Sequence, residues 1–402
     1  MLRPLHWGVV AWLWVLAAVA PTQSDELFAD PDSPGALAGL LLPPDHAAWQ
    51  VPTAAESPGY RFWSLPELRA NQFPPTCDGR RFLLKHMDTP GGMWAQIREV
   101  SGLLGLAMSI NRTLVTSTNV RHPWRYSPPA VATDTSGTYR PWEYWFEPLT
   151  SCEVPNHARP EKFLKGCPSA GTSALVVEAP NRDCYKAYAH PYPANGHQVW
   201  RNALLGSFVF RPAPKVRAHA LQLQESMGLQ QFRPFISIHV RRTDKKAETG
   251  RYVPIQSYLD VLAQIAKESG LRRVYMATDD PQLVSSVQQY KEYQWLTVPT
   301  RPYSRPKVGS HDFLKKYVYL PHRFNATSHT LDFLSECIML TQGEWFVGTV
   351  TSHVGMAIGD LMAAKHHNYT HYKTYLFDLN QKLCTGRVWF HKVPNRKFHR
   401  HC

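Results

Sequence analysis

The feature that most constrains the fold is an alternation of apolar strand-like runs with helical patterns over residues 214–362. The run at 235–240 is rich in β-branched and aromatic residues, as buried strands of parallel sheets are. A helical pattern follows at 255–269, and further strand-like runs lie at 274–277 and 345–347. Because strands that alternate with helices form parallel sheets, the sequence predicts an α/β fold with a Rossmann-type domain.

Charged residues gather at and just beyond the carboxyl end of the strand at 235–240. Ligands of open α/β sheets bind at such ends. Arginine suits a diphosphate because its planar fork bonds two oxygens at once. We therefore predict an anion site made by the residues His239, Arg241, Arg242, Asp244, Lys245 and Lys246.

A second anion site is predicted after the strand at 345–347. Gly348 opens a turn, Thr351, Ser352 and His353 follow, and a helical pattern begins near Val354. This order places free backbone N–H groups at the positive end of a helix, where phosphates bind. The alternative is that Thr351 or Ser352 only caps the helix. The expected place of this turn opposite the arginine cluster favours phosphate binding over a simple helix cap.

Asp279 and Asp280 follow the strand at 274–277, and Pro281 is expected to open a helix. The two carboxylates are either metal ligands or, more simply, turn and helix-start charges. A basic cluster neutralises a diphosphate without a cation, so no metal is expected.

Composition narrows the classes of ligand. The chain has 402 residues, of which 44% are hydrophobic, and a formal net charge of +13. Such a charge suits nucleic acid, an acidic membrane surface or an anionic substrate, or it is a diffuse basic surface without a specific partner. No zinc-finger spacing, basic heptad array or RNA-binding aromatic signature is present, so no nucleic-acid partner is expected.

The first residues have the pattern of a targeting segment. Arg3 precedes an apolar run at 7–20, which is shorter than the ~20 residues that span a bilayer. We expect a cleaved signal peptide, with a retained membrane anchor as the alternative. Three N-x-S/T sequons, at Asn111, Asn325 and Asn368, agree with a secretory-pathway lumen. The Golgi is the expected compartment, with the ER or secretion as alternatives.

Seven cysteines are also typical of an oxidising lumen, which would pair some of them. The odd number leaves at least one unpaired within the chain, and the sequence does not assign the pairs. Five segments are expected: a signal peptide or anchor at 1–24, a stem or linker at 25–75, an N-terminal α/β domain at 76–212 with a loop-rich, disulfide-stapled excursion, a Rossmann-type domain at 213–385, and a basic tail at 386–402.

Separated blocks between about residues 80 and 362 resemble a known family. The most specific are His-Val-Arg-Arg-Thr-Asp-Lys at 239–245 and the pair of segments at 331–335 and 347–354. Weaker matches lie at 274–281, 91–97, 111–114, 124–126 and 142–143. These blocks are similar to those of the α1,6-fucosyltransferases, which include the N-glycan core enzyme and the bacterial nodulation enzyme that fucosylates chitin oligosaccharides. The resemblance implies a two-domain GT-B-like glycosyltransferase whose GDP-sugar domain is at 213–385.

The family transfers fucose from GDP-β-L-fucose with inversion and without a metal. By resemblance, Arg241 grips the β-phosphate and stabilises charge on the departing GDP, while Arg242 is structural or acceptor-side. The remaining implied roles are guanine or ribose contacts for His239 and Asp332, packing near the nucleotide for Tyr126, diphosphate contacts for Thr351, Ser352 and His353, and support of the acceptor or the base for Lys245.

Inversion requires a general base for the acceptor hydroxyl. The family places a Glu shortly after the 239–245 block, and an ungapped alignment puts Thr249 there. Glu248 is one residue earlier and becomes the base candidate after a one-residue loop shift. Asp244 is the second candidate.

Two departures from the family leave the acceptor open. The long coiled-coil stem and the SH3-like domain of the animal members are not expected here, so a glycan or glycoprotein acceptor is expected without core N-glycan specificity. Protein O-fucosylation is the alternative enzyme activity. A non-catalytic lumenal binder of carbohydrate or nucleotide sugar is the second alternative, and the Thr249 mismatch motivates it.

Overall fold

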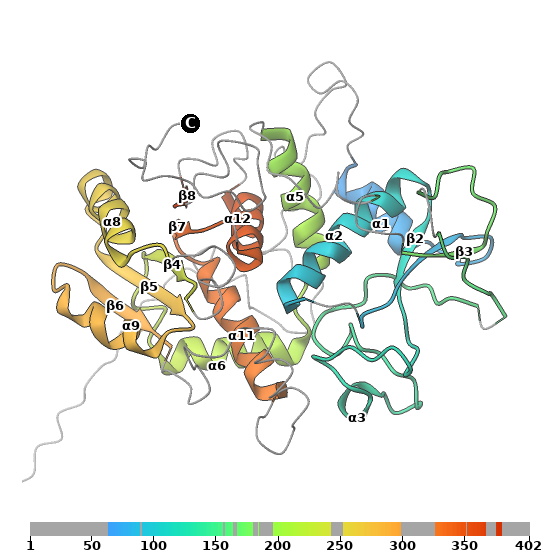
Figure 1. Ribbon diagram of the computed structural model, residues 1–402, viewed down its shortest axis with the longest axis horizontal. Helices are drawn as coiled ribbons and strands as arrows, with labels where there is room; N and C mark the ends of the chain where they lie inside the picture. Colours follow the sequence, from blue (N-terminus) through green and yellow to red (C-terminus); the bar gives the residue numbers. More distant parts are fainter. Residues whose placement is uncertain are drawn as a thin grey trace, which may run out of the picture. The chain divides into compact units, whose positions relative to one another are not determined.

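The computed structural model describes residues 63–88, 91–155, 157–163, 167–179, 184, 196–242, 252–298, 326–350, 352–366 and 375–379. Within these ranges the chain forms two parallel sheets, one of three strands and one of five, with helices between the strands (Figure 1). The predicted α/β class is therefore confirmed. The predicted targeting segment, the basic tail and most of the predicted stem lie outside the described residues.

The smaller sheet has the order β2-β1-β3, with β1 (Phe82–Lys85) in the centre. Its neighbours β2 (Thr113–Thr116) and β3 (Val176–Glu178) both run parallel to it. Helix α2 (Met93–Ser109) connects β1 to β2, and most of its apolar side chains are buried. A short helix, α3 (Pro129–Ala132), lies in the aromatic-rich segment that follows.

The structure adds a helix inside the predicted linker. Helix α1 (Leu65–Gln72) begins with a capping box, in which Ser64 and Glu67 bond each other's backbone N–H groups. At its other end the buried Gln72 amide accepts from the Leu114 N–H at 2.9 Å and donates to the Leu114 carbonyl at 3.1 Å. The helix has few buried apolar residues, so its periodicity was too weak to predict it.

The larger sheet has the order β6-β5-β4-β7-β8, and all its neighbouring strands are parallel. In chain order this is 3-2-1-4-5, the order of a Rossmann fold. The strands are β4 (Ile236–Val240), β5 (Arg273–Thr278), β6 (Gln294–Thr297), β7 (Trp345–Gly348) and β8 (Leu376–Asp378). The order reverses between β4 and β7, which makes the gap between their carboxyl ends the topological switch point.

Helices connect these strands. They are α5 (Gly196–Val209) and α6 (Pro214–Ser226) before β4, α8 (Ile255–Ser269) after it, α9 (Pro281–Ser286) with the 3-10 helix η3 (Val287–Gln289) after β5, α11 (Ala326–Leu340) before β7, and α12 (His353–His366) after it. Helix α8 has the predicted bounds, and Gly270 ends it in the left-handed conformation at φ 75°.

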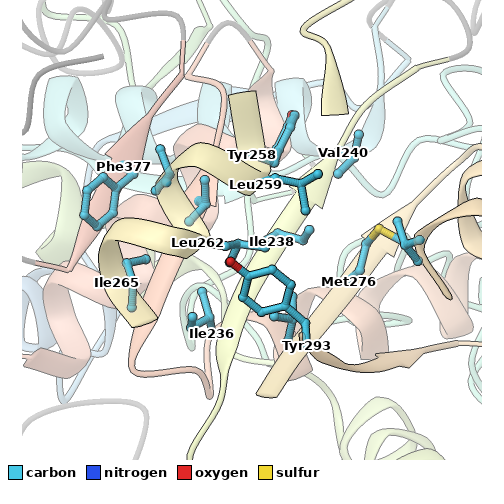
Figure 2. Close-up of a cluster of buried hydrophobic side chains, with 14 of the residues drawn as sticks. Ile236, Ile238, Val240, Tyr258, Leu259, Leu262, Ile265, Met276, Tyr293 and Phe377 are labelled. Atoms are coloured by element: carbon cyan, nitrogen blue, oxygen red, sulfur yellow. The ribbon is translucent and has the colours of Figure 1, made fainter. Parts of the chain in front are cut away.

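The core of the larger sheet is apolar on the face that α8 covers. Figure 2 shows Ile236 and Ile238 of β4 in one cluster with Leu262 and Ile265 of α8 and Met276 of β5. All five side chains are almost completely buried. Burial of a side chain of this size contributes roughly 1.5–3 kcal/mol, so this packing fixes the position of β4 and of the residues that follow it.

Contacts between helices join the two sheets. Arg98 of α2 forms a buried ion pair with Asp360 of α12. The indole N–H of Trp94, also on α2, donates to the sulfur of Cys337 on α11 at 3.1 Å. Two parallel sheets, one of them of Rossmann type, agree with the predicted GT-B-like class.

Two disulfides are present among the described cysteines. Cys77–Cys152 closes a sequence separation of 75 residues, and Cys167–Cys184 closes one of 17 within the loop-rich excursion. The predicted disulfide in the excursion is thus confirmed. Cys337 is a buried thiol, whereas Cys384 and Cys402 lie outside the described ranges. None of the helices in those ranges has the length and apolar character needed to cross a membrane.

Candidate functional site

The carboxyl ends of β4 and β7 lie side by side because these strands pair in parallel. Ile238 is opposite Val347 in the register, so His239 and Gly348 leave the sheet at the same edge. The described residues of the two clusters that the sequence predicts to bind anions are therefore neighbours at the topological switch point. Open α/β sheets bind their ligands at this position.

A carboxylate at the end of β5 holds the arginines that follow β4. Asp279 forms an ion pair with the guanidinium of Arg241. Its other oxygen accepts the backbone N–H of Arg242 at 2.7 Å. The side chain of Arg241 is 24% exposed, so a ligand can reach it. The Arg242 guanidinium lies over the ring of Tyr252, 5.2 Å from its centroid, which separates the two arginine side chains into different environments.

Asp280 has a different partner from Asp279. Its carboxylate caps α9 by accepting the Gln282 N–H at 3.0 Å. Its own N–H donates to the hydroxyl of Thr278 at 3.2 Å, and that hydroxyl donates to the Val240 carbonyl at 2.8 Å. The helix-start role expected for this pair is confirmed for Asp280. Both carboxylates thus have protein partners in this arrangement.

His239 is the last buried polar residue of β4, with 7% of its surface exposed. Its carbonyl accepts a hydrogen bond from the hydroxyl of Tyr258 at 3.3 Å. Tyr258 is buried in α8, and burial raises the pKa of its hydroxyl. The neutral hydroxyl therefore remains a donor that ties α8 to the end of β4.

The turn after β7 has the predicted order of strand, glycine turn and helix start. Ser352 is buried and directly precedes α12, and its N–H donates to the Thr349 carbonyl at 3.1 Å. The N–H of Val350 donates to the carboxylate of Asp378 at 3.1 Å. The start of α12 consequently lies at the carboxyl edge of the sheet, where its positive end favours an anion.

Gly355 is required by the close approach of α12 to this turn. A β-carbon at this position would collide with the carbonyl oxygen of Thr349. The first turn of α12 therefore lies directly against the backbone of the preceding turn, which leaves no room for a larger residue.

Tyr126 and Asp332 have partners outside the pair of strand ends. Tyr126 is buried in the N-terminal half, and its hydroxyl donates to the Gly91 carbonyl at 3.4 Å. Asp332 of α11 contacts the ring of His219 on α6, with Nε2 and Oδ1 2.7 Å apart. Neither contact tests the nucleotide roles predicted for these two residues.

Five of the predicted site residues lie outside the described ranges. They are Asp244, Lys245, Lys246, Glu248 and Thr351. Both base candidates, Glu248 and Asp244, are among them, so the identity of the base stays a prediction.

The sequence did not predict that two carboxylates at this edge of the sheet hold backbone groups of neighbouring loops. Asp279 was expected as a turn charge or a metal ligand, and Asp378 lies in a strand, β8, that had no predicted counterpart. The signal for Asp279 in the sequence was its place directly after a predicted strand. Asp378 gave no comparable signal, because β8 has only three residues.

Comparisons with known proteins identify a family of similar sequences. Residues 65–302 match the sequence model of the alpha-(1,6)-fucosyltransferase N- and catalytic domains. An alpha-(1,6)-fucosyltransferase of Drosophila melanogaster is 23% identical over 273 residues, which cover 61% of this chain and 41% of that enzyme. The chain thus matches about two fifths of the length of this curated relative.

Solved structures of fucosyltransferases are also similar. NodZ alpha-1,6-fucosyltransferase soaked with GDP-fucose has 13% identity and a TM-score of 0.41, and the match covers 70% of this chain and 92% of NodZ. POFUT1 in complex with GDP-fucose has 12% identity and a TM-score of 0.40, with 72% and 96% of the two chains covered.

Proposed function

The chain belongs to the alpha-(1,6)-fucosyltransferase family, and we propose on this basis that it moves L-fucose from GDP-β-L-fucose to a glycan acceptor, with inversion and an α1,6-like linkage. One observation of the site carries this proposal. The Arg241 guanidinium and the turn that begins α12 lie at neighbouring strand ends, at the switch point of a Rossmann-type sheet. Cationic and N–H donors on two sides of one position suit a diphosphate.

Arg241 is the proposed electrophilic group of the reaction. As the bond from fucose to GDP breaks, negative charge grows on the β-phosphate, and a guanidinium at that position stabilises the transition state. Asp279 holds Arg241 before the donor arrives, so little reorganisation is needed at the reacting centre. The N–H groups at the start of α12, with Ser352 and His353, complete the proposed phosphate contacts.

The remaining proposed roles follow the family pattern. His239 and Asp332 contact the guanine or ribose, Tyr126 packs near the nucleotide, and Thr351 adds a diphosphate contact. Glu248 removes the proton from the acceptor hydroxyl, with Asp244 as the second candidate and Lys245 in support. Arg242 faces Tyr252 and is assigned to structure or to the acceptor side. No step of this mechanism calls for a metal.

The proposed location is the lumen of the secretory pathway, with the Golgi as the compartment. Two disulfides support it, because such bonds persist in oxidising compartments. The sequons at Asn111, Asn325 and Asn368 agree with it. Immunofluorescence of the full chain against Golgi and ER markers tests the location.

A donor-transfer assay tests the activity. The purified chain is incubated with GDP-fucose and a panel of N-glycan, chitin-oligosaccharide and protein acceptors, and the product linkage is read by mass spectrometry. Arg241→Ala is expected to lower kcat/KM at least a hundredfold, because losing one strong transition-state donor costs ~3 kcal/mol. Arg242→Ala is the matched control and should act mainly on the acceptor KM. Absence of transfer to every acceptor, together with donor hydrolysis that Arg241→Ala leaves unchanged, would contradict the proposal.

The position of Thr249 favours one second candidate, a lumenal binder that has lost the catalytic base. The variant Glu248→Gln separates the two functions. In a transferase it should abolish transfer while GDP binding, measured by calorimetry, stays intact. In a binder, the wild type already binds GDP without turnover. Transfer to a protein hydroxyl in the same panel would instead identify a protein O-fucosyltransferase.

A further inference from the structure

The carboxylate of Asp378 lies beside the turn that joins β7 to α12. Asp378 is the last residue of β8 and is paired with Gly348, the last residue of β7. Its Oδ1 accepts the N–H of Val350 at 3.1 Å. A side chain of the outer strand thus holds a backbone group of the inner strand's turn.

Other backbone bonds fix the two sides of this turn. The Leu379 N–H donates to the Gly348 carbonyl at 2.9 Å, and the Ser352 N–H donates to the Thr349 carbonyl at 3.1 Å. The Asp378 carboxylate accepts the N–H of Val350, which lies in the chain between the Gly348 carbonyl and the Ser352 N–H. Its hydrogen bond therefore sets the direction of the Val350 peptide, immediately before the N–H groups that open α12.

A negative charge at the rim of an anion site is unfavourable by itself, because like charges repel. The same arrangement nevertheless occurs on the other side of the site. Asp279, at the end of β5, accepts the N–H of Arg242 in the loop that follows β4. The strands β5 and β8 flank the inner pair β4 and β7. Each flanking strand thus supplies a carboxylate that holds the loop of its inner neighbour.

We propose that Asp378 is a positioning residue for the donor diphosphate. By accepting the Val350 N–H it orients the turn, so that the N–H groups at the start of α12 point to one position. This inference rests on the proposed function, since it names the residue that shapes one half of that site. It predicts that the hydrogen-bond acceptor, and not the negative charge, is what the site needs at residue 378.

Two substitutions separate the acceptor from the charge. Asp378→Asn keeps an oxygen for the Val350 N–H and removes the repulsion, so the Kd of GDP should be unchanged or lower. Asp378→Ala removes the acceptor and should raise the Kd about tenfold, as expected for one lost hydrogen bond that orients the turn. If the Asp378→Ala protein does not fold, Asp378→Leu takes its place in the test, because leucine fills the volume of the side chain without a hydrogen-bond acceptor. Calorimetric titration of the full chain with GDP gives the Kd of the wild type and of each variant.

Asp280→Ala is the matched control, because Asp280 is also a carboxylate at a strand end but caps α9. It should lower thermal stability without changing the Kd. Hydrogen exchange provides a second readout that needs no nucleotide: the Val350 amide should be protected in the wild type and in Asp378→Asn, and should exchange faster in Asp378→Ala.

An Asp378→Ala protein that binds GDP as tightly as the wild type would overturn the inference. So would an Asp378→Asn protein that loses as much affinity as Asp378→Ala. A wild-type protein that binds no GDP at all would instead contradict the proposed function. The two failures are therefore distinguishable in one titration series.

Discussion

At the residue scale, Asp279 contacts groups of two consecutive residues in the loop after β4. One of its oxygens contacts the Arg241 guanidinium, and the other accepts the Arg242 N–H. The carboxylate therefore fixes both the side chain that we assign to the leaving group and the backbone that carries it. Preorganisation of this kind lowers a reaction barrier because the charged group is in place before charge develops.

Replacing Asp279 tests this preorganisation. Asp279→Ala removes both contacts, and we expect kcat to fall about a hundredfold. Asp279→Asn keeps an acceptor for the Arg242 N–H but loses the ion pair, so its kcat should lie between those of the wild type and Asp279→Ala. Steady-state kinetics with GDP-fucose measures both. Equal kcat values for the alanine variant and the wild type would show that Arg241 needs no such support.

Lys365 gives a pH dependence that can be traced to one group. Its ammonium donates to the carbonyls of Gln342 and Gly343 at 3.2 and 3.0 Å. Burial lowers its pKa from 10.5 to about 8, with Arg233 acting in the same direction and Glu344 in the opposite one. Between these two pKa values the unfolded chain holds the proton that the folded chain has released, so this group makes stability rise with pH.

We therefore expect the free energy of unfolding to increase from about pH 8 to pH 10.5 through Lys365. Lys365→Met should remove this contribution and flatten the slope over that window. Urea unfolding at a series of pH values measures the difference between the two proteins. Parallel curves would mean that Lys365 titrates alike in the folded and unfolded chains.

At the element scale, the sequence predicted those parts whose signal is local. Strand β4 and helix α8 were predicted because their apolar patterns are long and regular, and the turn before α12 because glycine and hydroxyl residues mark it. The short β8 and the helix α1 were missed because few residues carry their patterns. The side chains of Asp279 and Asp378 were missed as positioning groups for another reason. Their partners lie on neighbouring strands, and sequence spacing does not show which strands are neighbours.

The disulfide Cys77–Cys152 should contribute more stability than Cys167–Cys184. Its separation of 75 residues, against 17, restricts the unfolded chain more. The chain-entropy relation gives about 4 kcal/mol for the longer loop and about 3 kcal/mol for the shorter one. Thermal unfolding of Cys77→Ser/Cys152→Ser and of Cys167→Ser/Cys184→Ser compares them directly. A larger loss from the second pair would show that strain or local packing outweighs chain entropy.

At the scale of the whole molecule, the buried pair Arg98–Asp360 joins the two sheets through α2 and α12. Arg98→Met should lower the free energy of unfolding by about 3–5 kcal/mol, because Asp360 is left as a buried charge. The double variant Arg98→Met/Asp360→Leu should recover most of the loss. In the single variant, hydrogen exchange should show weaker protection of the backbone amides of both β1 and β4, since both sheets depend on the pair. A loss confined to β1 would mean that the sheets unfold independently.

The contact between Trp94 and Cys337 has a practical consequence for measuring how often α2 and α11 separate. The thiol is buried, and burial raises its pKa, so in the folded protein it has neither access to reagent nor thiolate character. An alkylating agent can reach Cys337 only during an opening of these helices. Mass spectrometry can follow how fast the peptide that contains Cys337 becomes labelled. This labelling rate therefore measures how often the two helices open.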